Sequence, residues 1–387
     1  MLRQKIMTGK IKPYQQCTLS LMDTISDPDI TFDESGICNY YYEYLRGVEN
    51  NVVKGAEGKN KLHYIIEQIK EAGKEKPYDC IMGLSGGVDS SYVAYMAKQY
   101  GLRPLAVHFD NGWNSELAVM NIENIVNKCG FDLHTLVVDW EEFKDLQIAY
   151  LKASVVDIEI PTDHAITATL FQLALKFDVK YILSGSNVYS EFIMPKNWIY
   201  HKPDHANLKS IHKAFGTKKL ATYPLNNTLL KKRTAWADIQ QVNVLNYLDF
   251  NKQEAKKIIA NELGWRDYGG KHYESLFTKF YQAYILPEKF KIDKRKPHLS
   301  NLIFAGQITK EAAVIEISKP LYTPDTFQAE KDFLLKKLGL QEKEWDKIMS
   351  TPPRSHYDFE IEMPLDKRFK WVKPFKQIYR KIFPVSS

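Results

Sequence analysis

Short apolar runs alternate with amphipathic stretches through the middle of this chain. Four runs have the length and composition of buried strands, and they cover residues 78–84, 104–109, 133–138 and 181–183. Apolar positions recur at helical spacing between or after them, in residues 91–100, 115–128, 139–153 and 165–177. Strands that alternate with helices predict an α/β fold, a doubly wound parallel sheet with helices on both faces.

The pattern changes outside this segment, and the chain divides into four predicted units. A small N-terminal lobe covers residues 1–60, and the α/β unit covers residues 61–230. A helical region assigned to substrate binding covers residues 231–353 and contains a helical hairpin over residues 323–349. Pro352 and Pro353 are expected to end the folded part, which leaves residues 354–387 as a basic, aromatic tail.

The first predicted strand runs into a serine- and glycine-rich turn that begins a helix. The turn reads Ser85-Gly86-Gly87-Val88-Asp89-Ser90. Glycines let the backbone approach an anion, and the N–H groups at a helix N-terminus donate to it. The turn lacks the lysine of a Walker A loop, and its hydroxyls suit a pyrophosphate, with Asp89 as a ligand of Mg²⁺. We therefore predict an ATP site here; an ordinary turn explains only Gly86 and Ser90.

Two further strand ends carry candidate ATP-binding residues. His108-Phe109-Asp110 ends the second strand, and Ser184-Gly185-Ser186 follows the fourth. Ligands of open parallel sheets bind outside the carboxyl ends of the strands, so both groups are expected to join the serine-glycine turn. The backbone near Phe109 would bind adenine, and the second group would close the nucleotide site. Each group taken singly is better explained as a plain turn or cap.

Other candidate groups lie in two further segments. Gly269-Gly270 precedes Lys271 as a second anion-binding turn, and we expect Lys271 to hold a phosphate during catalysis. Lys294 and Arg295 are further phosphate ligands, although a solvated basic surface explains them about equally well. Asp163-His164 lies at the start of a predicted helix and is a catalytic candidate, to orient the acceptor or accept a proton. A capping aspartate is the alternative there.

Composition and charge limit the choice of partners. Hydrophobic residues make up 44% and charged residues 26% of the chain, as in ordinary soluble enzymes. No apolar run reaches membrane-spanning length and no signal peptide is evident, so a cytoplasmic location is expected. Seven lysines and arginines follow Asp366, and without them the net charge of +6 becomes about −1, which argues against a nucleic-acid partner. Aromatic residues interleave with these charges, which suits peripheral membrane contact, a partner subunit or plain packing.

Several motifs together resemble one family. They include residues 23–24, 26–33 and 36–39 near the N-terminus, Pro161-Thr162-Asp163-His164, Gly269-Gly270-Lys271-His272-Tyr273-Glu274, Phe290, Asp293-Lys294-Arg295 and His298-Leu299-Ser300-Asn301-Leu302-Ile303, with the serine-glycine turn. They resemble the N-acetyl sugar amidotransferases of bacterial surface-polysaccharide (lipopolysaccharide O-antigen) and nonulosonic-acid biosynthesis, in the PP-loop ATP pyrophosphatase superfamily. The resemblance covers nearly the whole chain. It implies an adenine nucleotide alpha hydrolase-like fold.

The resemblance also implies a reaction and its partners. An acetamido group on a sugar, typically UDP-linked, would become an acetamidino group at the expense of ATP. Ammonia would come from separate subunits that resemble the glutaminase and cyclase of imidazole glycerol phosphate synthase. The chain has no recognisable glutaminase of its own. A PP-loop enzyme of tRNA modification and an inactive scaffold of the same fold are the alternatives, and thiolation is disfavoured because paired cysteines are missing.

The chain departs from this family at its N-terminus. Two Cys-x-x-Cys pairs, which form a tetrahedral zinc site in the family, read here Cys17-Thr-Leu-Ser20 and Cys38-Asn-Tyr-Tyr41. Two thiolates are too few for a stable structural zinc. We therefore predict that no zinc is bound, that Cys17 and Cys38 are remnants of the site, and that residues 40–42 pack in place of the ion.

Overall fold

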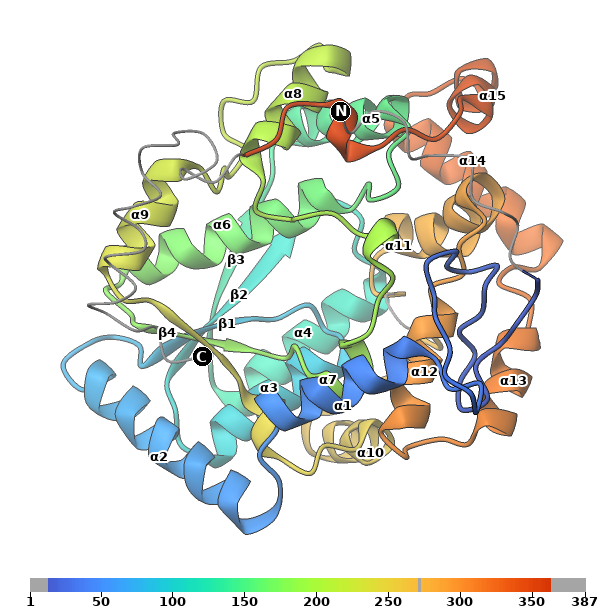
Figure 1. The fold of residues 1–387 in the computed structure, drawn as a ribbon. Coiled ribbons are helices and arrows are strands. Elements are labelled where there is room, and N and C mark those ends of the chain that lie inside the picture. Colours follow the sequence, from blue (N-terminus) through green and yellow to red (C-terminus); the bar gives the residue numbers. More distant parts are fainter. Residues whose placement is uncertain (1–12, 271–272, 363–387) are drawn as a thin grey trace, which may run out of the picture.

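A parallel sheet of five strands forms the centre of the computed structural model, which describes residues 13–270 and 273–362 (Figure 1). The strand order is β3-β2-β1-β4-β5. The strands are β1 (Cys80–Gly83), β2 (Pro104–Asp110), β3 (Asp132–Val137), β4 (Tyr181–Ser184) and β5 (Gln240–Asn243). The chain moves outward from β1 to β3 on one side and from β4 to β5 on the other, so the topology switches between β1 and β4.

Helices cover both faces of the sheet, as predicted. Apolar side chains of α2 (Gly55–Gly73), α3 (Val88–Gln99), α4 (Glu116–Cys129) and α10 (Lys252–Leu263) share one core with Cys80 and Met82 of β1. Ile81 points to the opposite face, where it packs with residues of α6 (Ile160–Lys176). Successive side chains of a strand alternate between faces, so β1 contributes to both cores. The doubly wound α/β fold is confirmed.

The fifth strand was not predicted. In β5, Gln240 and Gln241 are exposed and only Val242 is buried. It is an edge strand that pairs with β4 alone, so the alternating apolar pattern of a central strand is missing. β5 completes the sheet although it lies beyond residue 230, where the α/β unit was predicted to end.

The remaining elements surround the carboxyl edge of the sheet and its flanks. They are α1 (Asn39–Asn51), α5 (Trp140–Ala153), α7 (Val188–Glu191), η1 (Lys196–Trp198), α8 (His205–Phe215), α9 (Thr228–Trp236), η2 (Val244–Tyr247), α11 (Leu276–Phe280), η3 (Tyr281–Phe290), α12 (Arg295–Phe304), α13 (Lys310–Ser318), α14 (Pro324–Leu338), α15 (Glu342–Ser350) and η4 (His356–Asp358). The predicted hairpin is confirmed by α14 and α15. None of the helices in the described part of the chain has the length and apolarity needed to cross a bilayer.

One hydrophobic core joins the C-terminal helices to the α/β unit. Phe143 and Tyr150 of α5 pack in the same cluster as Phe277 and Phe280 of α11. Leu335 of α14 and residues of α6, α8 and α15 belong to this cluster as well. The region after residue 273 is therefore packed against the sheet domain through buried aromatic side chains rather than attached by a linker.

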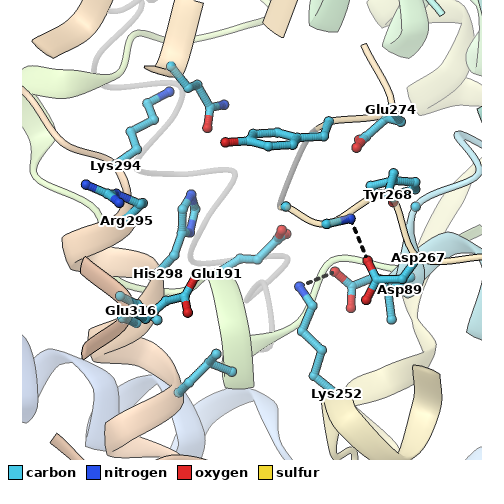
Figure 2. Close-up of a pocket in the computed structure, with 18 of the residues that line it drawn as sticks. Asp89, Glu191, Lys252, Asp267, Tyr268, Glu274, Lys294, Arg295, His298 and Glu316 are labelled. Atoms are coloured by element: carbon cyan, nitrogen blue, oxygen red, sulfur yellow. Dashed lines mark hydrogen bonds and ion pairs between the residues drawn. The ribbon is translucent and has the colours of Figure 1, made fainter. Parts of the chain in front are cut away.

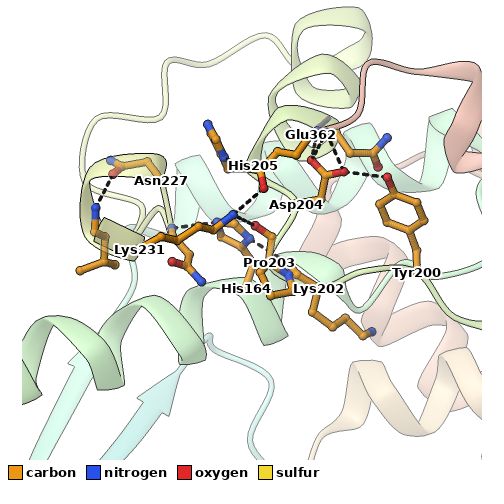
Figure 3. Close-up of polar contacts among 12 residues, drawn as sticks. His164, Tyr200, Lys202, Pro203, Asp204, His205, Asn227, Lys231 and Glu362 are labelled. Atoms are coloured by element: carbon orange, nitrogen blue, oxygen red, sulfur yellow. Dashed lines mark hydrogen bonds and ion pairs between the residues drawn. The ribbon is translucent and has the colours of Figure 1, made fainter. Parts of the chain in front are cut away.

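The expectation that the folded part ends at Pro352 and Pro353 is wrong. The backbone N–H of Arg354 donates to the Ser154 carbonyl at 2.9 Å. His356 is buried, and its carbonyl accepts a hydrogen bond from the Asn207 side chain at 2.8 Å. Figure 3 shows Glu362 beside α8 and α9, where it pairs with Lys231 at 2.6 Å. The two prolines only redirect the chain. The basic tail after Asp366 lies outside the described residues, and its membrane contact stays a prediction.

The N-terminal lobe lies beside α12 and α13 (Figure 1). The N–H of Leu21 donates to Ser300 Oγ at 3.2 Å, and Lys310 Nζ donates to the Cys17 carbonyl at 2.8 Å. Cys17 and Cys38 are both fully buried, and the Cys38 N–H donates to Cys17 Sγ at 3.3 Å. The lobe thus retains a turn in which a backbone N–H faces a cysteine sulfur.

The three tyrosines of this lobe differ from one another in their packing. Tyr40 shares a core with Cys17 and Cys38, as predicted, and its hydroxyl donates to an Asp27 carboxylate oxygen at 2.6 Å. Tyr41 instead packs edge-on against Phe304, and the partly exposed Tyr42 donates to Asp33. The prediction for Tyr41 and Tyr42 is therefore wrong. Helical geometry points consecutive residues of α1 in different directions, so one face receives only Tyr40.

Candidate active site

Hydroxyl groups close the serine-glycine turn on itself, and the helix that follows it begins without a side-chain cap. Ser85 Oγ lies 3.1 Å from Ser90 Oγ and accepts a hydrogen bond from the Gly87 N–H at 3.2 Å. Gly87 is the N-cap of α3 and makes no side-chain cap within the described structure. The first N–H groups of α3 therefore have no intrahelical acceptor, which is the property of an anion site.

Two glycines allow segments to approach this turn closely. Gly86 has φ +79°, and a Cβ there would lie 2.9 Å from the Ala118 carbonyl oxygen. A Cβ on Gly185 would lie 2.9 Å from the Asp89 carbonyl carbon and 3.0 Å from the Ser90 nitrogen. The loop after β4 thus packs directly on the turn after β1, at the topological switch point of the sheet.

A first cavity of about 640 Å³ opens at this turn (Figure 2). Ser85, Gly87, Asp89 and Ser90 line it, together with Gly185. Gly86 does not line it; its carbonyl accepts a hydrogen bond from Trp265 Nε1 at 2.8 Å, which holds the turn from behind.

Three side chains that sequence reasoning missed also line the first cavity. Lys252, at the start of α10, places its Nζ 3.8 Å from Asp89 Oδ2. Glu191, at the end of α7, lies near Asp89 and His298 in Figure 2. Tyr268 is the third, from the segment that enters the Gly269-Gly270 turn. A lysine in the first turn of a helix is unfavourable for the helix dipole, and this was the one available signal for Lys252.

A second cavity of about 600 Å³ adjoins the first. The two share Ser85, Glu191, Glu274, Gln282, Lys294 and His298. The second extends along the ends of β1 and β2, where His108 and Phe109 line it next to Leu84. The two adjoining cavities thus extend from the serine-glycine turn to the end of β2.

Several predicted residues shape the site without lining either of these cavities. Ser184 Oγ accepts a hydrogen bond from the Ser186 N–H at 3.1 Å, so both serines build the turn that carries Gly185. Asp110 Oδ1 accepts from the Gly112 N–H at 2.8 Å and from Asn114 Nδ2 at 3.1 Å. Asp110 borders only a separate depression beside α4. Ser184, Ser186 and Asp110 therefore stabilise the loops that follow β4 and β2.

His108 is held as a neutral ring at the end of β2. Its Nδ1 lies 3.2 Å from the Leu84 carbonyl, and its Nε2 lies 3.0 Å from Asn114 Nδ2. A proton on Nδ1 satisfies both contacts. Burial lowers the pKa of the imidazole, although the Leu84 carbonyl and Asp110 act in the opposite direction. The ring therefore presents no positive charge to the second cavity at neutral pH.

A cluster of charged side chains lies at the wall of the second cavity. Lys202 Nζ lies 2.8 Å from a carboxylate oxygen of Asp157 and 2.8 Å from one of Asp163. Lys294 is buried beside them, with its ammonium 5.3 Å from the centre of the Tyr281 ring. The predicted residues Asp163 and Lys294 are therefore brought to the cavity.

Glu159 completes this cluster and was not predicted. Burial, with a smaller contribution from Asp163, raises the pKa of its carboxyl to about 7, against the opposite effects of Thr278, Lys202 and Lys294. Its position just before α6 carried no motif, which is why sequence reasoning missed it.

Arg295 and His164 have local partners. The Arg295 guanidinium borders the first cavity, but its Nη2 lies 2.7 Å from Asp293 Oδ2 and its Nη1 donates to the Lys319 carbonyl. Lys271 lies outside the described residues, and its role stays a prediction.

His164 lies inside α6, because the helix begins at Ile160 rather than after the Pro161–His164 motif (Figure 3). Its Nδ1 lies 2.9 Å from the Lys202 carbonyl, and its Nε2 accepts from the Asn226 N–H at 2.9 Å. Burial lowers the pKa of the ring to about 4. The ring is fully buried and lines neither cavity, so the catalytic candidacy of His164 is corrected to a structural role.

Comparisons with known proteins agree with this architecture. Residues 79–291 match the asparagine synthase family, and residues 274–373 match the family described as LPS biosynthesis protein WbpG-like, C-terminal domain. A tRNA-specific 2-thiouridylase of Fusobacterium nucleatum is 22% identical over 46% of this chain and 49% of its own length. A tRNA(Ile)-lysidine synthase of Chlamydia pneumoniae is 37% identical over 17% of this chain and 22% of its own length. The chain thus spans half or less of these curated relatives.

Among solved structures, an NH₃-dependent NAD synthetase from Campylobacter jejuni is 14% identical over 67% of this chain and 97% of its own, with a TM-score of 0.31. The asparagine synthase match alone covers more than half of the chain, and it includes the serine-glycine turn and most of the segments that line the two cavities. The chain therefore belongs to the asparagine synthase family of PP-loop ATP pyrophosphatases, with a WbpG-like C-terminal domain.

Proposed function

We propose that this protein is an ATP-dependent amidotransferase that converts the acetamido group of a nucleotide-linked sugar into an acetamidino group. One observation carries the proposal: the PP-loop opens onto two adjoining cavities, and the WbpG-like region supplies Lys294 and Glu274 to both. A nucleotide and an acceptor therefore have room side by side, in a chain related to lipopolysaccharide biosynthesis proteins.

The chemistry needs an activated amide, because the oxygen of an acetamido group is a poor leaving group. Attack of this oxygen on the α-phosphorus of ATP gives an O-adenylyl imidate and releases pyrophosphate. The uncapped N–H groups of α3 and the hydroxyls of Ser85 and Ser90 would hold the pyrophosphate. The end of β2, at Phe109, would bind adenine in the second cavity. Ammonia then replaces adenylate at the imidate carbon.

Two carboxylates in the first cavity fit a magnesium ion that accompanies ATP. Asp89 and Glu191 both line it, and Mg²⁺ in nucleotide sites is commonly bound by one or two carboxylates and by phosphate oxygens. Mg²⁺ held there would offset the charge that develops on the departing pyrophosphate. Lys252, next to Asp89, would add a positive charge to the same region.

Ammonia would come from a separate glutaminase subunit, delivered with the help of a cyclase-like subunit. The isolated chain should then form product with ammonium salts, whereas glutamine should support turnover only when a glutaminase is added. Product formation from glutamine by the chain alone would contradict this division of labour.

The test uses ATP, Mg²⁺, ammonium chloride and a panel of UDP-linked diacetamido sugars. Mass spectrometry should find AMP, pyrophosphate and a sugar in which oxygen is replaced by NH. Asp89→Asn should lower acceptor-dependent ATP/pyrophosphate exchange by about 10²-fold or more, because a charge at the reacting phosphates is lost. Asp178→Asn, at a carboxylate that is 84% exposed, is the matched control. Release of ADP and orthophosphate instead of AMP would overturn the proposal.

A second candidate follows from the two curated relatives, which are both tRNA-modifying enzymes by name. Their matches cover half or less of their own lengths. Binding of bulk tRNA that weakens steeply with salt would favour this candidate, since phosphate contacts release counterions. An inactive scaffold, the remaining alternative, would show no exchange with any acceptor.

A further inference from the structure

The wall of the second cavity includes a carboxylate that the proposed nucleotide site leaves unused. Glu159 lines this cavity and is only 8% exposed. Its Oε2 accepts a hydrogen bond from Thr278 Oγ1 at 2.8 Å, whereas its Oε1 has no hydrogen-bond partner among the described residues. A buried acceptor without a donor costs free energy, so this arrangement favours a ligand that brings a donor into the cavity.

The charges around Glu159 indicate the sign of that ligand. The cluster contains three carboxylates and two ammonium groups, which belong to Asp157, Glu159, Asp163, Lys202 and Lys294. Lys202 pairs with both aspartates, and Lys294 makes no ion pair within 4.0 Å among the described residues. Three carboxylates and two ammonium groups leave a net charge of −1 when all are ionised. One small cation would neutralise the cluster.

The ligand set argues for a cation that donates hydrogen bonds rather than a metal ion. Divalent metals in proteins take several oxygen ligands at short distances, and the described residues provide no group of three or more metal-binding side chains here. A carboxylate that lines a cavity and has one oxygen without a donor suits an N–H donor. Ser85 of the serine-glycine turn lines the same cavity, so such a donor would share this space with the nucleotide site.

We propose that Glu159 binds an ammonium ion in the second cavity and accepts one of its protons, which produces ammonia beside the acceptor. This inference rests on the proposed amidotransferase function and adds the residue that handles the nitrogen donor. Glu159 is then a catalytic residue, because it touches the reacting nitrogen.

The atoms and charges of the step balance. The carboxylate takes a proton from NH₄⁺ and becomes a neutral acid, and the freed nitrogen lone pair forms a C–N bond to the imidate carbon. The C–O bond to adenylate breaks, and AMP leaves with its electron pair. One ammonia proton moves to the sugar nitrogen, and the product is an amidinium. A carboxyl whose pKa is raised to about 7 exchanges protons efficiently near neutral pH.

Thermal unfolding tests the ammonium site without any turnover. At pH 8, ammonium chloride should raise the Tm of the wild-type protein by about 1–3 °C over tetramethylammonium chloride at equal ionic strength. Glu159→Gln should abolish this difference, and Glu141→Gln, at a largely exposed carboxylate on α5, should retain it. An equal rise with potassium chloride, or no ammonium-specific rise in the wild-type protein, would overturn the assignment.

A kinetic comparison separates base catalysis from a structural role. Glu159→Gln should keep acceptor-dependent ATP/pyrophosphate exchange near the wild-type rate but lower ammonium-dependent product formation by about 10²–10⁴-fold. Hydroxylamine is already neutral at pH 7 and should suffer a much smaller loss. Equal losses in exchange and with both nucleophiles would refute the role. An ammonium-specific Tm rise in a protein that shows no exchange with any acceptor would refute the proposed function while supporting the site.

Discussion

Replacing Glu159 by glutamine should change how the stability of this protein depends on pH. Desolvation is the main reason why the pKa of this carboxyl rises from 4.5 to about 7 on folding. Between these values the folded protein still holds a proton that the unfolded chain has lost, so the wild-type free energy of unfolding falls as pH rises. Glutamine does not titrate, and the variant avoids this loss.

The size of the effect follows from the shift in pKa. A shift of about 2.5 units at about 1.36 kcal/mol per unit corresponds to roughly 3 kcal/mol. The advantage of Glu159→Gln over the wild-type protein should therefore grow by about 1 kcal/mol between pH 5 and pH 6, and level off above pH 7.

Urea unfolding at pH 5, 6, 7 and 8 gives the free energy of unfolding of the wild-type protein and of Glu159→Gln. Titratable groups that both proteins share contribute equally to each value, so they cancel in the difference. Glu141→Gln should show a flat difference. If the difference for Glu159→Gln is also constant over this range, the carboxyl titrates alike in the folded and unfolded states, and the reasoning is refuted.

Three further perturbations have defined outcomes. Gly185→Ala should lower ATP/pyrophosphate exchange by about 10-fold or more, because its Cβ would meet the backbone of Asp89; Gly83→Ala, whose Cβ would have ordinary contacts at 3.7 Å, should leave exchange intact. His356→Ala should lower the free energy of unfolding, measured in urea, by about 2–3 kcal/mol, because the hydrogen bond to Asn207 and the stacking on the Tyr200 ring at 4.4 Å are both lost. Tyr357→Ala, at an exposed position, should lower it by less than about 0.5 kcal/mol. Lys252→Met should raise the KM for ATP by about 10-fold with a smaller effect on kcat, and an unchanged KM would remove Lys252 from the nucleotide site.

The parts of the fold that the sequence predicted are those in which local chemistry determines structure. β1, β2 and β4 are continuous apolar runs, and the serine-glycine turn carries its own glycines and helix start. β5 escaped prediction because Val242 is its one buried side chain, and pairing with β4 rather than composition makes it a strand. Pro161 marked the start of α6 too late, since proline is well tolerated in the first turn of a helix.

The candidate site was predictable only where its residues belong to a motif. Asp89 and Gly185 follow strand ends, and topology alone brings them together. Lys252 and Glu159 come from a helix start and a loop with no motif, and tertiary packing alone brings them to the cavities. His164 has the residue type of a catalyst, yet both its ring nitrogens are taken up by backbone groups. Residue type and spacing could not reveal which polar side chains become buried when the chain folds.

The aromatic core shared by α5 and α11 limits how relatives of this protein can exchange parts. The residues matched by the two families overlap at positions 274–291, and Phe277 and Phe280 in this overlap belong to the same buried core as Phe143 and Tyr150. A chimaera joined there would set new aromatic side chains against an unadapted surface, and either overpacking or voids would follow. Side-chain replacements within the cavities should therefore disturb this core less than recombination of whole C-terminal regions.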